Sequence, residues 1–208
     1  MARRSRARRA WAAALAGAAL LATAATPAEE EARRTVREVV DRVLVVLRTP
    51  ELASAERRAR IQAVAWEWFD FGTMSQLVVA RDWRRFTPEQ REAFVIEFRE
   101  LLSARYGRKL DGYGQEDVEI DDTRVEPGGD VTVRTRILRP SGGSDVIVDY
   151  RLRREQDRLR AIDVVIEGVS LVFSYRGQFQ GILTSNGPQG LIDRLREKNA
   201  TLSGTGGD

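Results

Sequence analysis

Residues 131–153 read VTVRTRILRPSGGSDVIVDYRLR, and this stretch decides the fold. Apolar and polar side chains alternate along both of its halves, with Val131, Val133, Thr135 and Ile137 on one face of the first half. A period of two is typical of a strand that buries one face. Residues 140–144 between the halves are rich in Gly and Ser, as loops are. The two halves are therefore predicted to be adjacent antiparallel strands.

Two further strands flank this pair. Val118 and Ile120 alternate with acids before a turn at 127–130, and residues 159–167 follow a tight turn at Gln156-Asp157. Sequential strands with short turns indicate a curved antiparallel meander rather than βαβ units. The sequence predicts four strands, closed by Gly168.

Outside the sheet the apolar period changes from two to about 3.6, which indicates helices. We expect helices over 29–48, 55–69 and 71–79. The capping box Thr87-Pro88-Glu89-Gln90 predicts a long helix to about residue 110. Ser170 is the expected N-cap of a helix that ends at Asn186-Gly187, before a last amphipathic helix. The predicted fold class is α+β, with N-terminal helices and two C-terminal helices that enclose an apolar cavity against the sheet.

The first residues have the pattern of an export signal. Five arginines and no acid precede an apolar run over 11–21, and small residues follow at Ala22-Thr23-Ala24. Such a run is too short to span a bilayer, which takes roughly twenty residues. We expect residues 1–24 to be a cleaved signal peptide, exported by the general or the twin-arginine route. Residues 25–200 then form one domain, and 201–208 a flexible Gly-rich tail.

Charge and composition exclude several classes of function. Loss of the five leader arginines (Arg3, Arg4, Arg6, Arg8, Arg9) lowers the formal charge from +3 to about −2, so the basic balance gives no support for nucleic-acid binding. The chain has neither Cys nor His, which excludes disulfides, Ser-His and Cys-His pairs and most zinc sites. We therefore expect neither a catalytic residue nor a metal.

The motif order resembles one known family. Three stretches carry the resemblance: Phe69-Asp70-Phe71 through Met74 to Arg81-Asp82-Trp83; Thr87-Pro88-Glu89-Gln90-Arg91 with the apolar residues up to Leu110; and DVVIEGVSL (163–171) continuing to Tyr175-Arg176 and Phe179. Together they resemble the MlaC family, also called the toluene-tolerance family, of periplasmic phospholipid-binding proteins. Ala80, where the family has Gly, and Leu159, where an aromatic residue is common, depart from its pattern.

The resemblance implies a function, a compartment and partners. Members resemble one another in holding phospholipid acyl chains in an apolar cavity, with the headgroup in water. They carry lipid between an outer-membrane lipoprotein–porin complex and an inner-membrane ABC transporter. By this resemblance the chain is expected to be a soluble, monomeric, non-enzymatic phospholipid carrier of the periplasm, with no cofactor besides its lipid.

A lipid cavity needs aliphatic and aromatic walls. We expect one wall from a strand face and the helix after it, and another from the helix after Pro88. For each residue an ordinary filled core is the alternative. The predicted lining residues are Phe94, Phe98, Tyr106, Val133, Val146, Val148, Tyr150, Val165, Val169, Leu171, Val172, Tyr175 and Phe179.

Two other functions remain open from the sequence. Asp163 shares a predicted strand face with Leu159 and Val165, as the acid of a cone-fold isomerase or dehydratase would, although no second acid converges on it. An open apolar groove would instead suit an envelope peptide-binding module. Arg151 and Arg176 are candidates to approach a lipid phosphate, but pairing with Asp149, Asp163 or Glu167 is the expectation.

Overall fold

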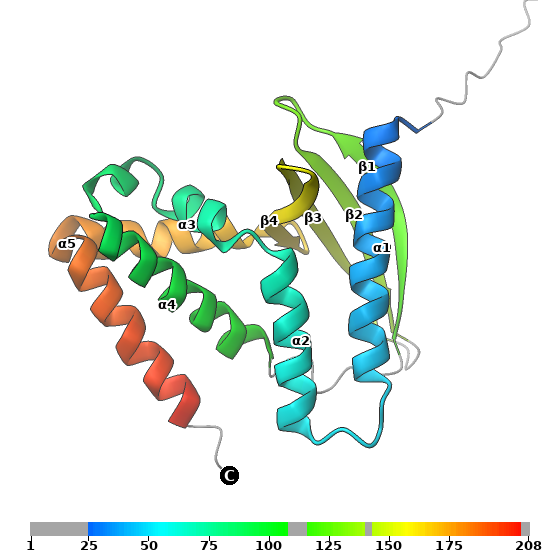
Figure 1. Cartoon of the computed structure of the whole chain (residues 1–208), viewed down its shortest axis with the longest axis horizontal. Coiled ribbons are helices and arrows are strands. Elements are labelled where there is room, and N and C mark those ends of the chain that lie inside the picture. Colours follow the sequence, from blue (N-terminus) through cyan, green and yellow to red (C-terminus); the bar gives the residue numbers. More distant parts are fainter. Residues whose placement is uncertain (1–24, 108–115, 140–142, 205–208) are drawn as a thin grey trace, which may run out of the picture.

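The computed structural model describes residues 25–107, 116–139 and 143–204 (Figure 1). The predicted signal peptide, 1–24, lies outside these residues. The helices before the sheet are α1 (Pro27–Leu47), α2 (Ser54–Trp68), α3 (Phe71–Val79), the 3-10 turn η1 (Ala80–Arg85) and α4 (Pro88–Gly107). Each predicted N-terminal helix is therefore confirmed to within a few residues, except that the predicted end of the last helix, 108–110, lies outside the described residues.

The predicted antiparallel meander is also confirmed, with one addition. Strands β1 (Asp117–Val125), β2 (Val131–Leu138), β3 (Val146–Glu155) and β4 (Arg158–Ile166) pair in sequence order. A short fifth strand, β5 (Val169–Ser170), pairs antiparallel with β4. The sequence does not predict β5, because a strand of two residues is too short to show a period of two. Gly168, with φ 79°, makes the turn between β4 and β5.

A β-bulge divides β4 into two parts whose side chains alternate out of step with each other. The register of β3 with β4 shifts between Arg151 and Leu152, so Leu152 pairs with Ala161 but Tyr150 pairs with Val164. Side chains alternate between faces along a strand, and one extra residue reverses that alternation. Leu159 and Ala161 therefore face the side of Leu152 and Tyr150, whereas Asp163 and Val165 face the other side.

After the sheet, α5 (Leu171–Gly204) contains both predicted C-terminal helices. Gly187, with φ 67° and ψ −172°, breaks the helical conformation just before Pro188, where the sequence predicts a stop. Ser170 caps the first half, since its Oγ accepts a hydrogen bond from the Phe173 amide at 3.0 Å. The second half extends into 201–204, so helix replaces the first part of the predicted flexible tail. Residues 205–208 lie outside the described chain.

The layers follow from these elements. α1 packs over β1 and β2 on one face of the sheet, and α2 lies between α1 and the bundle of α3, α4 and α5 (Figure 1). The Asp70 amide donates to the Ala161 carbonyl at 2.9 Å and the Arg160 guanidinium donates to the Phe69 carbonyl at 2.7 Å. The segment between α2 and α3 is thus fastened to β4, which joins the helical part to the sheet.

Candidate ligand-binding site

The apolar interior of the described residues forms two clusters. The helical cluster lies among α3, α4 and α5 and includes five of the predicted lining residues, Phe94, Phe98, Val172, Tyr175 and Phe179. The sheet cluster lies between α1, Trp68 of α2 and one face of the sheet, and includes Val133, with Tyr150 against it. Phe69 is the residue that packs against both clusters.

The helical cluster is filled by its own side chains. The rings of Phe94 and Phe98 stack with centroids 5.9 Å apart, and Phe179 meets both edge-on at 6.0 and 5.8 Å. Tyr106 packs at the margin of the cluster, and burial raises the pKa of Tyr175 above its usual value. These spacings are typical of packed aromatic pairs, so this region has the form of an ordinary core.

Tyr150 of β3, one of the predicted lining residues, packs at the margin of the sheet cluster. Its ring lies 5.0 Å from that of Trp68, and burial raises its pKa to about 12, so the hydroxyl stays neutral at any physiological pH. Val133 pairs with it across the β2–β3 ladder. Val133 and Tyr150 therefore face α1 and α2 rather than solvent.

Beyond Tyr150 the same sheet face continues as four aliphatic residues, here called the aliphatic row: Ile137, Val146, Val148 and Ile166. Ile137 pairs with Val146, and Val148 pairs with Ile166, which places all four on the face of Tyr150. None of the four belongs to either cluster within the described part of the chain. Val148 is only 5% exposed, whereas Ile137, Val146 and Ile166 are half-buried. The row is thus apolar, partly buried and outside both clusters.

Three predicted lining residues differ from these in orientation or exposure. Val165 pairs with Asp149 and faces the opposite side of the sheet, because the bulge in β4 reverses the alternation that the sequence suggested. Val169 is 58% exposed, because β5 places it at the edge of the sheet. Leu171 is half-buried at the first residue of α5. Val169 pairs with Ile166, so it lies at the exposed edge of the face that carries Val146, Val148 and Tyr150.

The charged candidates have structural partners, but not the predicted ones. Arg151 pairs with Asp130 at 2.7 Å, where Arg153 also binds, and the two guanidiniums hold the pKa of Asp130 below its usual value. Arg176 donates to the Leu77 carbonyl at 2.5 Å. The expected partners of both arginines were wrong because they depend on strand register and helix docking, which are long-range.

Asp163 has the environment of a structural carboxylate. Its oxygens accept from the amides of Val164 and Val172 at 2.8 and 3.1 Å and from Ser170 Oγ at 2.5 Å, which ties β4 to the start of α5. It does not share a face with Leu159, contrary to the prediction. Among the described residues, no group of three acidic, His or Cys side chains could hold a metal ion.

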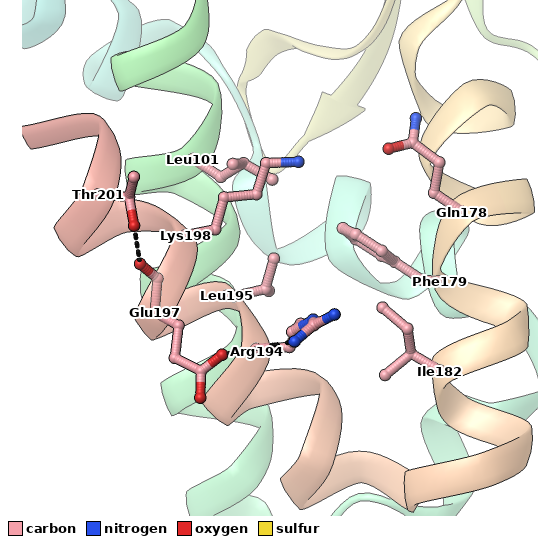
Figure 2. A pocket seen from close by; sticks show the side chains of 9 residues that line it. All are labelled: Leu101, Gln178, Phe179, Ile182, Arg194, Leu195, Glu197, Lys198 and Thr201. Atoms are coloured by element: carbon pink, nitrogen blue, oxygen red, sulfur yellow. Dashed lines mark hydrogen bonds and ion pairs between the residues drawn. The ribbon is translucent and has the colours of Figure 1, made fainter. Parts of the chain in front are cut away.

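A cleft that the sequence analysis missed lies between the two halves of α5 and α4 (Figure 2). Its volume is about 410 Å³, and Leu101, Phe179, Ile182 and Leu195 form its apolar part. Its polar residues are Gln178, Arg194, Glu197, Lys198 and Thr201. The predicted break at Gly187 was the available signal, since a break brings two helix faces together. A second groove, of about 550 Å³, lies between α1 and α2 around Val45 and Val64.

In the ranges that the structure describes, no helix has the length and hydropathy needed to cross a membrane.

Fold and interior together define a class of α+β proteins. Helices cover one face of an antiparallel meander, and apolar residues on that face extend beyond the packed clusters. The family model described as MlaC protein matches residues 37–197. The chain therefore belongs to the MlaC family.

Individual relatives agree with this assignment. The intermembrane phospholipid transport system binding protein MlaC of Haemophilus influenzae is 24% identical over 58% of this chain and 58% of its own length. The toluene tolerance protein ttg2D of Pseudomonas putida is 23% identical over 56% of this chain and 54% of its own. The chain thus spans little more than half the length of these curated relatives.

A solved structure matches over a longer range. The phospholipid-binding protein from Ralstonia solanacearum, in complex with a phospholipid, superposes with a TM-score of 0.75 and is 27% identical. The match covers 83% of this chain and 99% of that one.

Proposed function

We propose that this protein binds a phospholipid and carries it through the periplasm. The observation that carries the proposal is the aliphatic row, a partly buried apolar strip on the helix-facing side of the sheet that belongs to neither packed cluster. Acyl chains that lie along this row would also meet Tyr150, which follows Val148 on the same strand face. The phospholipid bound to the Ralstonia protein supports the choice of ligand.

The energetics of lipid transfer explain why such a site is useful. A two-chain phospholipid carries on the order of 30 methylenes, and exposing them to water costs roughly 20–25 kcal/mol at about 0.8 kcal/mol each. A protein lowers that cost by replacing water with aliphatic side chains along the chains. The headgroup needs no buried partner, because it remains in water.

The proposal extends to compartment and partners. The basic and apolar leader in residues 1–24 supports export, and the names of the relatives support an intermembrane transport system. We propose that the chain exchanges lipid with an outer-membrane lipoprotein–porin complex and an inner-membrane ABC transporter, and that it acts without catalysis. The expected monomeric state belongs to the same proposal.

The first test is direct. Protein purified from the envelope is measured by native mass spectrometry, and its bound lipid is extracted and identified. A stoichiometric phospholipid is the expected result. A protein that is lipid-free as purified and also takes up no labelled phospholipid from vesicles would contradict the proposal.

The second test uses two matched valines. Val148→Phe adds apolar bulk in the aliphatic row, and Val125→Phe adds the same bulk at a site that is 45% exposed and lies at the other end of the sheet. We expect Val148→Phe to lower phospholipid occupancy severalfold while the circular dichroism spectrum stays native, and Val125→Phe to keep full occupancy. Equal occupancy in both variants would place the acyl chains away from the row.

A further inference from the structure

We infer that the cleft between the two halves of α5 is a second binding site, for an anionic amphiphile with a single alkyl chain. The inference is independent of the aliphatic row, since none of that row lines the cleft. Three observations carry it: the fixed shape of the cleft, its volume, and the separation of its apolar and cationic parts.

The break at Gly187 sets the angle between the two halves of α5 and so the shape of the cleft. Gly187 has a backbone conformation that L side chains rarely adopt, and Pro188 begins the second half of the helix. A Cβ at Gly190 would lie 2.3 Å from the Cβ of Asn186, so the chain passes itself closely at this point. Leu191, Ile192 and Leu195 then anchor the second half in the helical cluster. The two walls are therefore set by packing on both sides of the break.

The volume selects a single chain. A methylene occupies roughly as much space as a water molecule in the liquid, about 30 Å³. A cleft of about 410 Å³ therefore holds roughly a dozen methylenes, in contrast to the roughly 30 of a two-chain phospholipid. Clefts of this size are in the range of small-molecule sites.

The charges select an anionic head. Arg194 and Lys198 lie one turn apart on the second half of α5 and extend toward its first half, where Phe179 and Ile182 present apolar carbon (Figure 2). Arg194 contacts Glu197 only at 3.6 Å, and its side chain is 71% exposed. Lys198 forms no ion pair with any described residue. Glu197 is the one acid among the lining residues, so the cations exceed it. A phosphate or carboxylate would gain charge-assisted hydrogen bonds from both cations.

The experiment measures binding of dodecyl phosphate, below its micelle concentration, to the full exported chain by titration calorimetry. Dodecyl trimethylammonium is the ligand control, with the same chain and the opposite charge, and inorganic phosphate tests the head alone. We expect one saturable site for dodecyl phosphate, binding at least tenfold weaker for the cationic amphiphile, and no measurable binding of inorganic phosphate.

Two variants locate the site. Arg194→Gln with Lys198→Gln should weaken dodecyl phosphate binding at least tenfold, because both charge-assisted contacts are lost. Arg81→Gln with Arg84→Gln makes the same charge change on exposed residues of η1 and should leave binding within twofold. Both double variants alter exposed side chains, so the fold is expected to persist.

The outcome is also separable from the proposed phospholipid site. Val148→Phe should leave dodecyl phosphate binding unchanged even where it removes phospholipid. Loss of dodecyl phosphate binding in Val148→Phe, equal binding of both amphiphiles, tight binding of inorganic phosphate alone, or no binding at all would each overturn the inference.

Discussion

The helical cluster and the aliphatic row are built from the same kinds of residue but differ in what fills the space beside them. In the cluster, Phe94, Phe98 and Phe179 contact one another at ring distances of 5.8–6.0 Å. Along the row, Ile137, Val146, Val148 and Ile166 face the helices without joining either cluster. Apolar periodicity therefore predicts which side chains avoid water, but not whether protein or ligand covers them.

The largest expected effect tests whether the cluster is filled by protein alone. Phe98→Ala removes a fully buried ring and should lower the free energy of unfolding by about 3–5 kcal/mol. Because protein atoms surround the ring, the loss should be the same with and without bound phospholipid. Urea unfolding of both forms measures it.

The control for this variant is Phe173→Ala, since Phe173 is 73% exposed and its loss should change stability by less than about 0.5 kcal/mol. If added phospholipid restored much of the stability lost in Phe98→Ala, the cluster would be part of the lipid site and the contrast with the aliphatic row would fail.

A smaller loss of stability is expected at Asp163, which links β4 of the sheet to the start of α5. Asp163→Ala leaves two amides and the Ser170 hydroxyl without their acceptor, which should cost about 2–3 kcal/mol. Asp163→Asn retains one carbonyl oxygen and should lose about half as much. Thermal and urea unfolding give both values, and an unchanged Asp163→Ala would mean that the start of α5 is held by packing rather than by this carboxylate.

The smallest effect has the opposite sign. Ala80 follows α3 with φ 50°, a conformation that costs a non-glycine residue of order 1 kcal/mol or more. The packing of Val78 and Val79 in the helical cluster holds this backbone conformation in place. Glycine adopts it without strain, so Ala80→Gly should stabilise the protein by about 0.5–1 kcal/mol.

The matched change in a regular helix is Ala93→Gly in α4, which should destabilise by about 1 kcal/mol. Differential scanning calorimetry of the two variants compares them directly. Destabilisation by both would show that Ala80 bears no strain.

Local patterns predicted most of the fold. The capping box at Thr87 and Gln90 forms as expected, since the backbone amide of Gln90 donates to Thr87 Oγ1 at 3.2 Å. The Ser170 cap forms as well. These features depend on residues three apart, which the sequence displays directly. The departure from the family glycine at Ala80 also fell on one of the non-glycine residues with a positive φ.

The candidate site was less predictable, because it depends on register and docking. Nothing local marks the bulge between Ala161 and Val164, and it alone decides that Val165 faces away from Val148. The exposure of Val169 depends on β5, and the partner of Arg151 is 21 residues away at Asp130. The residues on uninterrupted strand stretches, Val133, Val146, Val148 and Tyr150, kept the common face that their period indicated.

The bulge also decides where β4 tolerates a change of length. Removal of Ile162, the residue without a partner in β3, would restore regular pairing and leave both parts of the strand on their present faces, because Ala161 and Val164 already face the same side. Removal of a residue on either side of the bulge would instead turn Leu159 or Ile166 over to the opposite face. Single-residue changes of length in β4 outside the bulge should thus be far less tolerated than in the turn at Gln156-Asp157, so homologues are expected to vary in length at that turn.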